Sequence, residues 1–293
     1  MHIPVPFRRW QNDQVKAEVR YPVTVVLALI FVAMLFVIFI FADVLAPHDY
    51  RTQSLLSRLK PPAFLGGDWS YPLGTDELGR DILSRLIYAI RFSILVALGG
   101  TAIGAIIGTT LGFIAAHFRG AVEESIMMLV DVQTTIPFTL IALALVAAFG
   151  GSFVLFIAIM GLYGWEVFAR LTRGVVISAN TQGYAKAMVA LGARPLYIYA
   201  RHILPNVTSI LVVQYTLNFP NVVLLETSLS FLGLGIQPPL TSLGQMLGAG
   251  RAYLTSAWWI AVLPGVTIFL TTMSISIIGD WLRDRLDPTL RNA

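Results

Sequence analysis

The chain has 293 residues, of which 56% are hydrophobic and 12% are charged, with a mean hydropathy of +0.75 and a formal net charge of +4. A soluble domain carries roughly 25% charged residues, so this composition excludes a soluble globular protein and indicates an integral protein of the lipid bilayer. The basic residues lie in short clusters beside apolar runs, which argues against nucleic-acid binding, and the absence of cysteine excludes a disulfide, a thiolate metal site and a cysteine nucleophile.

The first apolar run covers residues 21–42 and follows the basic residues Arg8, Arg9, Lys16 and Arg20. Its length matches the roughly 20 residues that a membrane-spanning helix needs and exceeds the roughly 7 to 15 residues of a signal-peptide core. We therefore expect an uncleaved first transmembrane helix after a cytoplasmic N-terminal segment of about twenty residues. This helix and the extracytoplasmic loop expected after it together form the segment 21–91.

Five further apolar runs follow along the chain, near residues 92–117, 126–149, 153–171, 207–234 and 258–281. The sequence thus predicts an all-α membrane protein with six transmembrane helices. Basic residues gather before the first run, in alternate connections and after the last run, so the positive-inside rule places both termini in the cytoplasm. The predicted core of this single domain covers 92–282, with its main cytoplasmic loop near 172–205 and a cytoplasmic tail at 283–293.

The second run contains Gly100, Gly104, Gly108 and Gly112, whose four-residue period places them on one stripe of a helix. Such a stripe lets another helix backbone approach closely. It indicates either a tight, sliding contact at the centre of the bundle or plain packing inside one subunit. The second explanation is favoured, because small-residue stripes are ordinary membrane packing.

The stretch YPLGTDELGRDILSRL combines charged residues with helix-start signals just before the second run. Thr75 or Asp76 is expected to cap a helix that starts near Glu77. Asp81 and Arg85 have the spacing of an i,i+4 ion pair. Local capping and pairing would account for most of the charge in this stretch.

Between the fourth and fifth runs lies a basic, glycine-broken stretch, YAKAMVALGARPLYIYARHILPN, which begins at Tyr184. Gly192 is expected to end one helix and Pro195 to begin another, which gives a helix, a corner and a helix. In the first of these, Tyr184, Met188 and Leu191 recur at helical spacing on one side. The segment is either a low-relief knob for the groove of a partner protein or a helix that rests on lipid headgroups, and the spacing leaves both open.

Asp131, Glu166 and Glu226 are acidic residues within or at the edge of apolar runs, where charge is costly. Each is either a structural polar lock or a contact for a transported solute. Glu226, between the apolar VVLL and the polar TSLS, is the best candidate for the amino group of a peptide. The four histidines are too dispersed for a metal site, no G-x-x-x-x-G-K-[ST] motif occurs, and no catalytic constellation is visible.

Four stretches together resemble one known family. KAMVALGARPLYIYARHILP resembles the EAA loop of ABC importer permeases. LGTDELGRDILSRL, LLETSLSFLGLGIQPP and GDWLRDRLDPTLR resemble the type I, binding-protein-dependent subgroup that serves dipeptides, oligopeptides and nickel. The resemblance implies a permease of a bacterial inner membrane that imports di- or oligopeptides or a similar small solute, with a type I fold and a cytoplasmic coupling helix.

The resemblance also implies partners and site residues. The expected partners are a second homologous permease, two ATP-binding subunits that hold ATP and Mg²⁺, and an extracytoplasmic solute-binding protein, with no cofactor or metal in this chain. The residues implied in coupling to the ATPases are Tyr184, Lys186, Ala187, Met188, Leu191, Gly192, Ala193 and Pro195. The residues implied in an extracytoplasmic gate or docking surface are Thr75, Asp76, Arg80, Asp81, Gly233 and Gly235. Lys186 stands where the family often has glutamate, so the role of an acidic residue there stays open.

Two other functional classes compete with this interpretation. An ion-driven secondary transporter, the main alternative, would need charges in the membrane and an internal repeat, and no such repeat is visible in the sequence. An intramembrane enzyme would need an acid, base or metal constellation that the sequence does not display. The permease is therefore the preferred function.

Overall fold

The computed structural model describes residues 22–181, 188, 192 and 195–286, and every regular element in these ranges is helical. The α-helices are α1 (Val23–Leu45), α2 (Ile82–Phe118), α3 (Gly120–Thr135), α4 (Phe138–Phe149), α5 (Phe153–Gly161), α6 (Trp165–Thr181), α8 (Pro195–Ile198), α9 (Leu204–Phe231), α10 (Leu243–Gly250) and α11 (Trp259–Leu286). Short turns connect them: η1 (Leu55–Ser57), η2 (Ala63–Leu65), the π turn η3 (Tyr199–Ile203) and η4 (Arg251–Tyr253). The predicted all-α fold is confirmed.

Five stretches of the described chain are long and apolar enough to cross a membrane: α1, α2, α5 with α6, α9 and α11. The sixth predicted span, near 126–149, consists of α3 and α4, which are bent by 92° at a short break. Pro137 causes the break, because a residue before proline avoids helical dihedrals and Ile136 is extended at ψ 127°. The pair therefore counts as a sixth span only in broken form.

Two helices extend beyond the predicted spans. α2 begins at Ile82, well before the expected start near residue 92, and α6 continues to Thr181 instead of ending near residue 171. The loop between α1 and α2 is correspondingly confined to residues 46–81. The predicted helix start near Glu77 is wrong, because Asp81 is the N-cap and its side chain accepts from the backbone N–H of Ser84.

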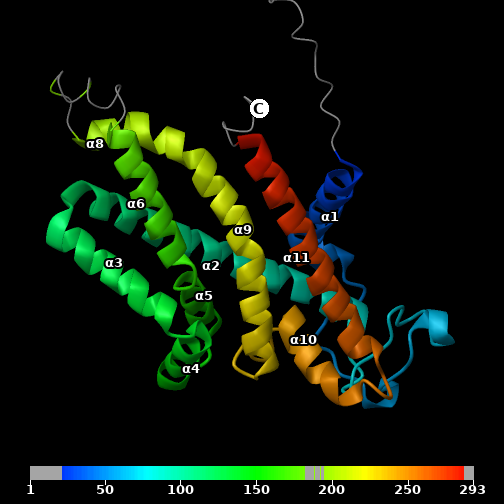
Figure 1. Cartoon of the computed structure of the whole chain (residues 1–293). Helices are drawn as coiled ribbons and strands as arrows, with labels where there is room; N and C mark the ends of the chain where they lie inside the picture. Colours follow the sequence, from blue (N-terminus) through cyan, green and yellow to red (C-terminus); the bar gives the residue numbers. More distant parts are fainter. Residues whose placement is uncertain (1–21, 182–187, 189–191, 193–194, 287–293) are drawn as a thin grey trace, which may run out of the picture.

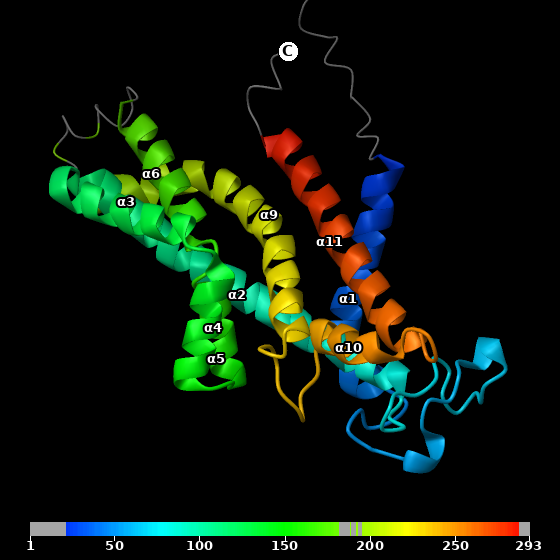
Figure 2. The same ribbon diagram turned by 60° about the horizontal axis from the view of Figure 1, so that its bottom comes forward.

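The helices form a bundle with two distinct sides. Figures 1 and 2 show α3, α4 and α5 on one side, α1 and α11 on the other, α9 between them, and α2 running obliquely across the bundle. The beginning of α1, the end of α11, the end of α6 and α8 gather at one end of the bundle (Figure 1). We call this the coupling end. The loop between α1 and α2 and the helix α10 lie at the opposite end, which we call the loop end.

The glycine stripe of α2 packs against the span formed by α5 and α6. A Cβ on Gly100 would lie 2.7 Å from the Cβ of Met160, and one on Gly112 would lie 2.6 Å from the carbonyl oxygen of Ala169. A side chain at these positions would push the helices apart. The predicted packing inside one subunit is thus confirmed for the stripe.

Candidate functional site

The coupling end contains the segment expected to meet the ATPases. Pro195 begins α8, as predicted for the second helix of the corner. Gly192 is exposed and has φ +75°, a left-handed conformation that commonly ends helices and that glycine adopts without strain. Met188 is partly buried and packs against an apolar cluster that includes Ile198. The other predicted coupling residues, Tyr184, Lys186, Ala187, Leu191 and Ala193, lie outside the described residues.

The π turn η3 ties this end to the last turns of α2. The hydroxyl of Tyr199 and Nδ1 of His117 lie 3.0 Å apart, and the ring of Tyr199 packs 5.8 Å from that of Phe113. A displacement of the segment that precedes α9 would therefore act on α2 directly.

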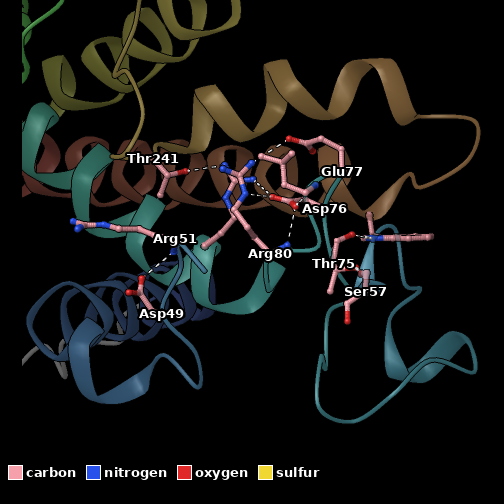
Figure 3. Close-up of polar contacts among 11 residues, drawn as sticks. Asp49, Arg51, Ser57, Thr75, Asp76, Glu77, Arg80 and Thr241 are labelled. Atoms are coloured by element: carbon pink, nitrogen blue, oxygen red, sulfur yellow. Dashed lines mark hydrogen bonds and ion pairs between the residues drawn. The ribbon is translucent and has the colours of Figure 1, made fainter. Parts of the chain in front are cut away.

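At the loop end, Asp76 organises a buried cluster of polar side chains (Figure 3). The side chain of Asp76 is 0% exposed, and its Oδ1 accepts from the backbone N–H groups of Leu78 at 2.8 Å and Arg80 at 2.9 Å. Its Oδ2 accepts from Nε of Arg80 at 2.6 Å and from Nη1 of Arg85. Arg85, whose side chain is 4% exposed, also donates to Oγ1 of Thr241 at 3.4 Å. Asp76 thus joins the loop before α2, the first turn of α2 and the segment before α10.

The contacts of Asp76 differ from one predicted ion pair and leave Asp81 with other partners. Arg85 pairs with Asp76, so the predicted pair between Asp81 and Arg85 is wrong. Asp81 instead accepts from the hydroxyl of Ser84 at 2.6 Å and lies 3.6 Å from Nδ1 of His48. The sequence contained the signal, because Asp81 and Ser84 have the spacing of a helix cap.

Thr75 fixes the same loop to α11. Its Oγ1 accepts from the backbone N–H of Lys60 at 2.8 Å, and its carbonyl oxygen accepts from Nε1 of Trp259 at 3.2 Å. Thr75, Asp76 and Asp81 are buried, whereas Arg80 is partly exposed. Their described contacts lie within the chain, and a role in docking or gating stays a prediction.

A cavity of about 520 Å³ borders the Asp76 cluster. Its lining comes from three places in the chain and includes Arg51, Arg80, Arg85, Pro238 and Gln245. Nε of Arg51 donates to the hydroxyl of Tyr50 at 2.9 Å, and this hydrogen bond raises the pKa of Arg51 above its ordinary value. The cavity therefore lies between the charged loop before α2 and the turn after α9.

The predicted turn after the fifth span is present. α9 ends at Phe231, and Gly233 follows with φ +80°. A Cβ on Gly235 would overlap the hydroxyl of Ser230, so the chain can only close back on α9 if residue 235 has no side chain. The proposed gating role of Gly233 and Gly235 stays a prediction.

Glu226 lies in a buried cluster of polar side chains between α2, α9 and the start of α10. It is 1% exposed, and its carboxylate accepts from the hydroxyl of Ser230 at 2.7 Å and from that of Ser93 at 3.4 Å. Ser93 also accepts from the backbone N–H of Leu243, and Ser242 lies 3.4 Å from Ser230. This arrangement favours the structural lock over direct contact with a solute, because no side of the carboxylate is open in this conformation. Sequence reasoning found Glu226 and the polar stretch that contains Ser230, and missed the partners Ser93 and Ser242, which come from distant parts of the chain.

Asp131 occupies the opposite environment, on the outer surface of α3. Its side chain is 72% exposed and accepts from Nη2 of Arg170 at 3.0 Å. With Glu124 it lines a cavity of about 550 Å³ on the α3 surface. Apolar neighbours on the same face are also exposed, among them Met128 at 63% and Val132 at 49%. An acid in this position needs water or a partner protein beside it.

Glu166 is held at the break between α5 and α6. Nε2 of Gln133 donates to Oε2 of Glu166 at 3.0 Å and to the carbonyl oxygen of Leu162 at 2.6 Å. Nε1 of Trp165 donates to Oε1 of the same amide. The sequence singled out Glu166 and gave no sign of Gln133, which ties α3 to this break.

Comparison with known proteins assigns this architecture to a family. Residues 108–292 match the family described as the binding-protein-dependent transport system inner membrane component. Residues 24–62 match the N-terminal transmembrane domain of oligopeptide transport permease C. The two matches together take in α1 and the chain from the second half of α2 onward, with residues 63–107 between them.

Individual relatives agree over most of the chain. A di/tripeptide transport system permease protein of Pseudomonas aeruginosa is 40% identical over 263 residues, which cover 89% of this chain and 87% of the relative. A dipeptide transport system permease protein of Haemophilus influenzae is 34% identical, with 90% of each chain covered. A glutathione transport system permease protein of Pectobacterium atrosepticum is 35% identical, with 90% of this chain and 86% of the relative covered.

A solved structure supports the fold at lower identity. The MetNI methionine ABC transporter, in inward-facing conformations, aligns with a TM-score of 0.57 and 17% identity, covering 70% of this chain and 98% of the matched chain. The chain therefore belongs to the family of binding-protein-dependent transport system inner membrane components, the multi-pass permease subunits of bacterial ABC importers, whose ATPase activity resides in separate subunits.

Proposed function

We propose that this permease forms one half of a pathway that imports di- or tripeptides, or a peptide of similar size such as glutathione. The relatives named for these solutes match about nine-tenths of the chain and support this substrate class. The second half of the pathway is a homologous permease. Two ATP-binding subunits supply ATP hydrolysis with Mg²⁺, and a solute-binding protein delivers the peptide.

The exposed face of α3 and α4 is the observation that carries the pairing with a second permease. In lipid, the ion pair between Asp131, whose side chain is 72% exposed, and Arg170, whose side chain is 52% exposed, would lack hydration. Against a second permease with a water-filled path between the two chains, this exposed pair is hydrated. The exposed apolar side chains of Met128 and Val132, which line the same cavity as Asp131, provide packing surface beside the pair.

The coupling end is assigned to the cytoplasm. Basic residues concentrate in the segments at this end, as the positive-inside rule requires of cytoplasmic segments. The left-handed Gly192 and the start of α8 at Pro195 support a sharp corner that a cleft of an ATPase can receive. Reporter fusions test the orientation: a periplasmic reporter active after Leu290, or a cytoplasmic reporter active within residues 55–67, would contradict it.

Reconstitution tests the function itself. The chain is co-expressed with the permease, ATPase and binding-protein products of its neighbouring genes, and the complex is placed in liposomes. We expect uptake of a labelled dipeptide that requires both the binding protein and ATP. Uptake by this chain alone under an ion gradient would instead support a secondary transporter.

The exposed face of α3 provides a specific variant for the same assay. We expect Asp131→Leu to weaken co-purification of the second permease or to lower uptake. The matched control is Asp49→Leu, since Asp49 is also exposed and lies in the loop between α1 and α2. Equal behaviour of the two variants would remove the argument for pairing through α3.

A further inference from the structure

A short projecting segment of the loop between α1 and α2 exposes large apolar side chains. We call residues 63–69 the lateral arm. Phe64 is 62% exposed, Leu65 is 49% exposed and Trp69 is 80% exposed. The arm lies outside the helices that span the membrane, so these groups face water unless another surface covers them. A cluster of exposed apolar groups of this kind marks contact with protein or with lipid.

The base of the arm is fixed to the bundle. The backbone N–H of Thr75 donates to the carbonyl oxygen of Lys60 at 3.0 Å, and that of Ala63 donates to the carbonyl oxygen of Pro72 at 3.2 Å. The carbonyl oxygen of Thr75 in turn accepts from Nε1 of Trp259, the first residue of α11. These bonds hold the base of the arm level with the first turn of α11.

The direction of the arm favours lipid over a docked protein. Figures 1 and 2 both show η2, the light blue turn within the arm, to the side of the beginning of α11 and not beyond it. A binding protein approaches the loop end along the helix axes, whereas lipid headgroups surround the side of the bundle. The nearby surface of α11 is also apolar and exposed, with Val262 at 39%, Val266 at 48% and Phe269 at 61%.

We propose that the lateral arm lies in the headgroup region of the leaflet at the loop end and buries Phe64, Leu65 and Trp69 among lipids. An indole ring suits this region, because it combines an apolar body with a polar N–H. The exposed guanidinium of Arg58, close to the arm in the chain, is available to lipid phosphates. The arm anchors the outer end of α11 at a fixed depth. This inference rests on the membrane spans and not on the proposed peptide import.

Because this chain has no cysteine, a single cysteine introduced into the arm is the only labelling site in the chain. Phe64→Cys and Trp69→Cys are each labelled with a fluorophore in the complete transporter. The complex is reconstituted in nanodiscs of phosphatidylethanolamine and phosphatidylglycerol, with and without lipids that carry a spin label near the headgroup. Gln53→Cys is the matched control, because Gln53 is an exposed polar residue of the same loop.

We expect the spin-labelled lipid to quench fluorescence at positions 64 and 69, and aqueous iodide to quench it only weakly there. At position 53 we expect the reverse. Strong iodide quenching at 64 and 69 without lipid quenching would overturn the proposal, because the arm would then be in water. Protection from both quenchers would also overturn it, since the arm would then lie against a protein, and dependence on added binding protein would identify that protein.

Discussion

Removal of the negative charge of Asp76 tests whether the buried cluster at the loop end holds the permease together. In Asp76→Asn the amide oxygen can still accept from the backbone N–H groups of Leu78 and Arg80, so those hydrogen bonds are retained. What is lost is the charge opposite the guanidinium of Arg85, whose side chain is 4% exposed, and the acceptor Oδ2, because the amide nitrogen that replaces it cannot accept from Arg80 or Arg85. Leaving a buried charge without its partner costs about 3–5 kcal/mol.

A neighbouring ion pair provides the control. Glu77 accepts from Arg80 at 3.1 Å, and its side chain is 19% exposed. A more exposed pair of this kind contributes about 0–1 kcal/mol, so Glu77→Gln should have a small effect. The measurement is the thermal midpoint of the solubilised complex, followed by size-exclusion chromatography.

The double variant Asp76→Asn with Arg85→Met separates a charge effect from a loss of packing. Both charges are then removed, and the methionine fills much of the space of the arginine stem, so we expect higher stability than in Asp76→Asn alone. A midpoint for Asp76→Asn no lower than that of Glu77→Gln would refute the reasoning. A double variant as unstable as the sum of its single variants would refute it as well.

Three further predictions concern other parts of the molecule. Because the structure favours a structural lock, we expect Glu226→Gln to impair folding and assembly at least as much as peptide uptake, since the amide nitrogen cannot accept from a serine hydroxyl as the carboxylate oxygen does; normal assembly with lost uptake would instead favour contact with the solute. Gly108→Leu should lower the yield of folded chain, because a Cβ there would lie 2.6 Å from the Cβ of Phe168 and overpacking costs about 1–3 kcal/mol. Gly174→Leu is the control and should leave the yield unchanged, because the space around Gly174 is open. Gly192→Leu places a side chain at φ +75°, at a cost of about 1–2 kcal/mol, and should lose substrate-stimulated ATP hydrolysis while the complex still forms; unchanged stimulation would contradict a role for the corner.

Most membrane spans could be predicted from the sequence because they are long runs with high hydropathy and few charged residues. The start of α2 was not predicted correctly, because the sequence indicated a separate helix from near Glu77 and a span from near residue 92, whereas one helix runs through both from Ile82. Tyr88 and Arg91 both donate to Asp43 at the end of α1, at 2.7 Å and 2.8 Å. This partner is far away in the sequence, so local pattern gave no sign that the two predicted helices are one.

The roles of the candidate site residues also depend on partners that are far away in the sequence. From the sequence, Glu226 and Asp131 shared the same two explanations, a structural lock or a solute contact, and Glu226 was the preferred candidate for a peptide amino group. The structure buries Glu226 among serines of three elements and exposes Asp131 beside Arg170. The sequence predicted a single span near 126–149 and missed the bend at Pro137 between α3 and α4, whose size depends on packing that proline alone does not specify.

The length of α2 has a mechanical consequence. It is a single helix of 37 residues, tied at one end to Tyr199 and at the other to Asp76. Its glycine stripe lies between these two contacts and packs closely on α5 and α6, so it can act as a fulcrum. About 35 Å of helix separates the centre of the stripe from Ile82. A tilt of about 5° at the coupling end would then displace the loop end of this lever by roughly 3 Å. The same helix can therefore carry movement from one face of the membrane to the other without any change in its internal hydrogen bonds.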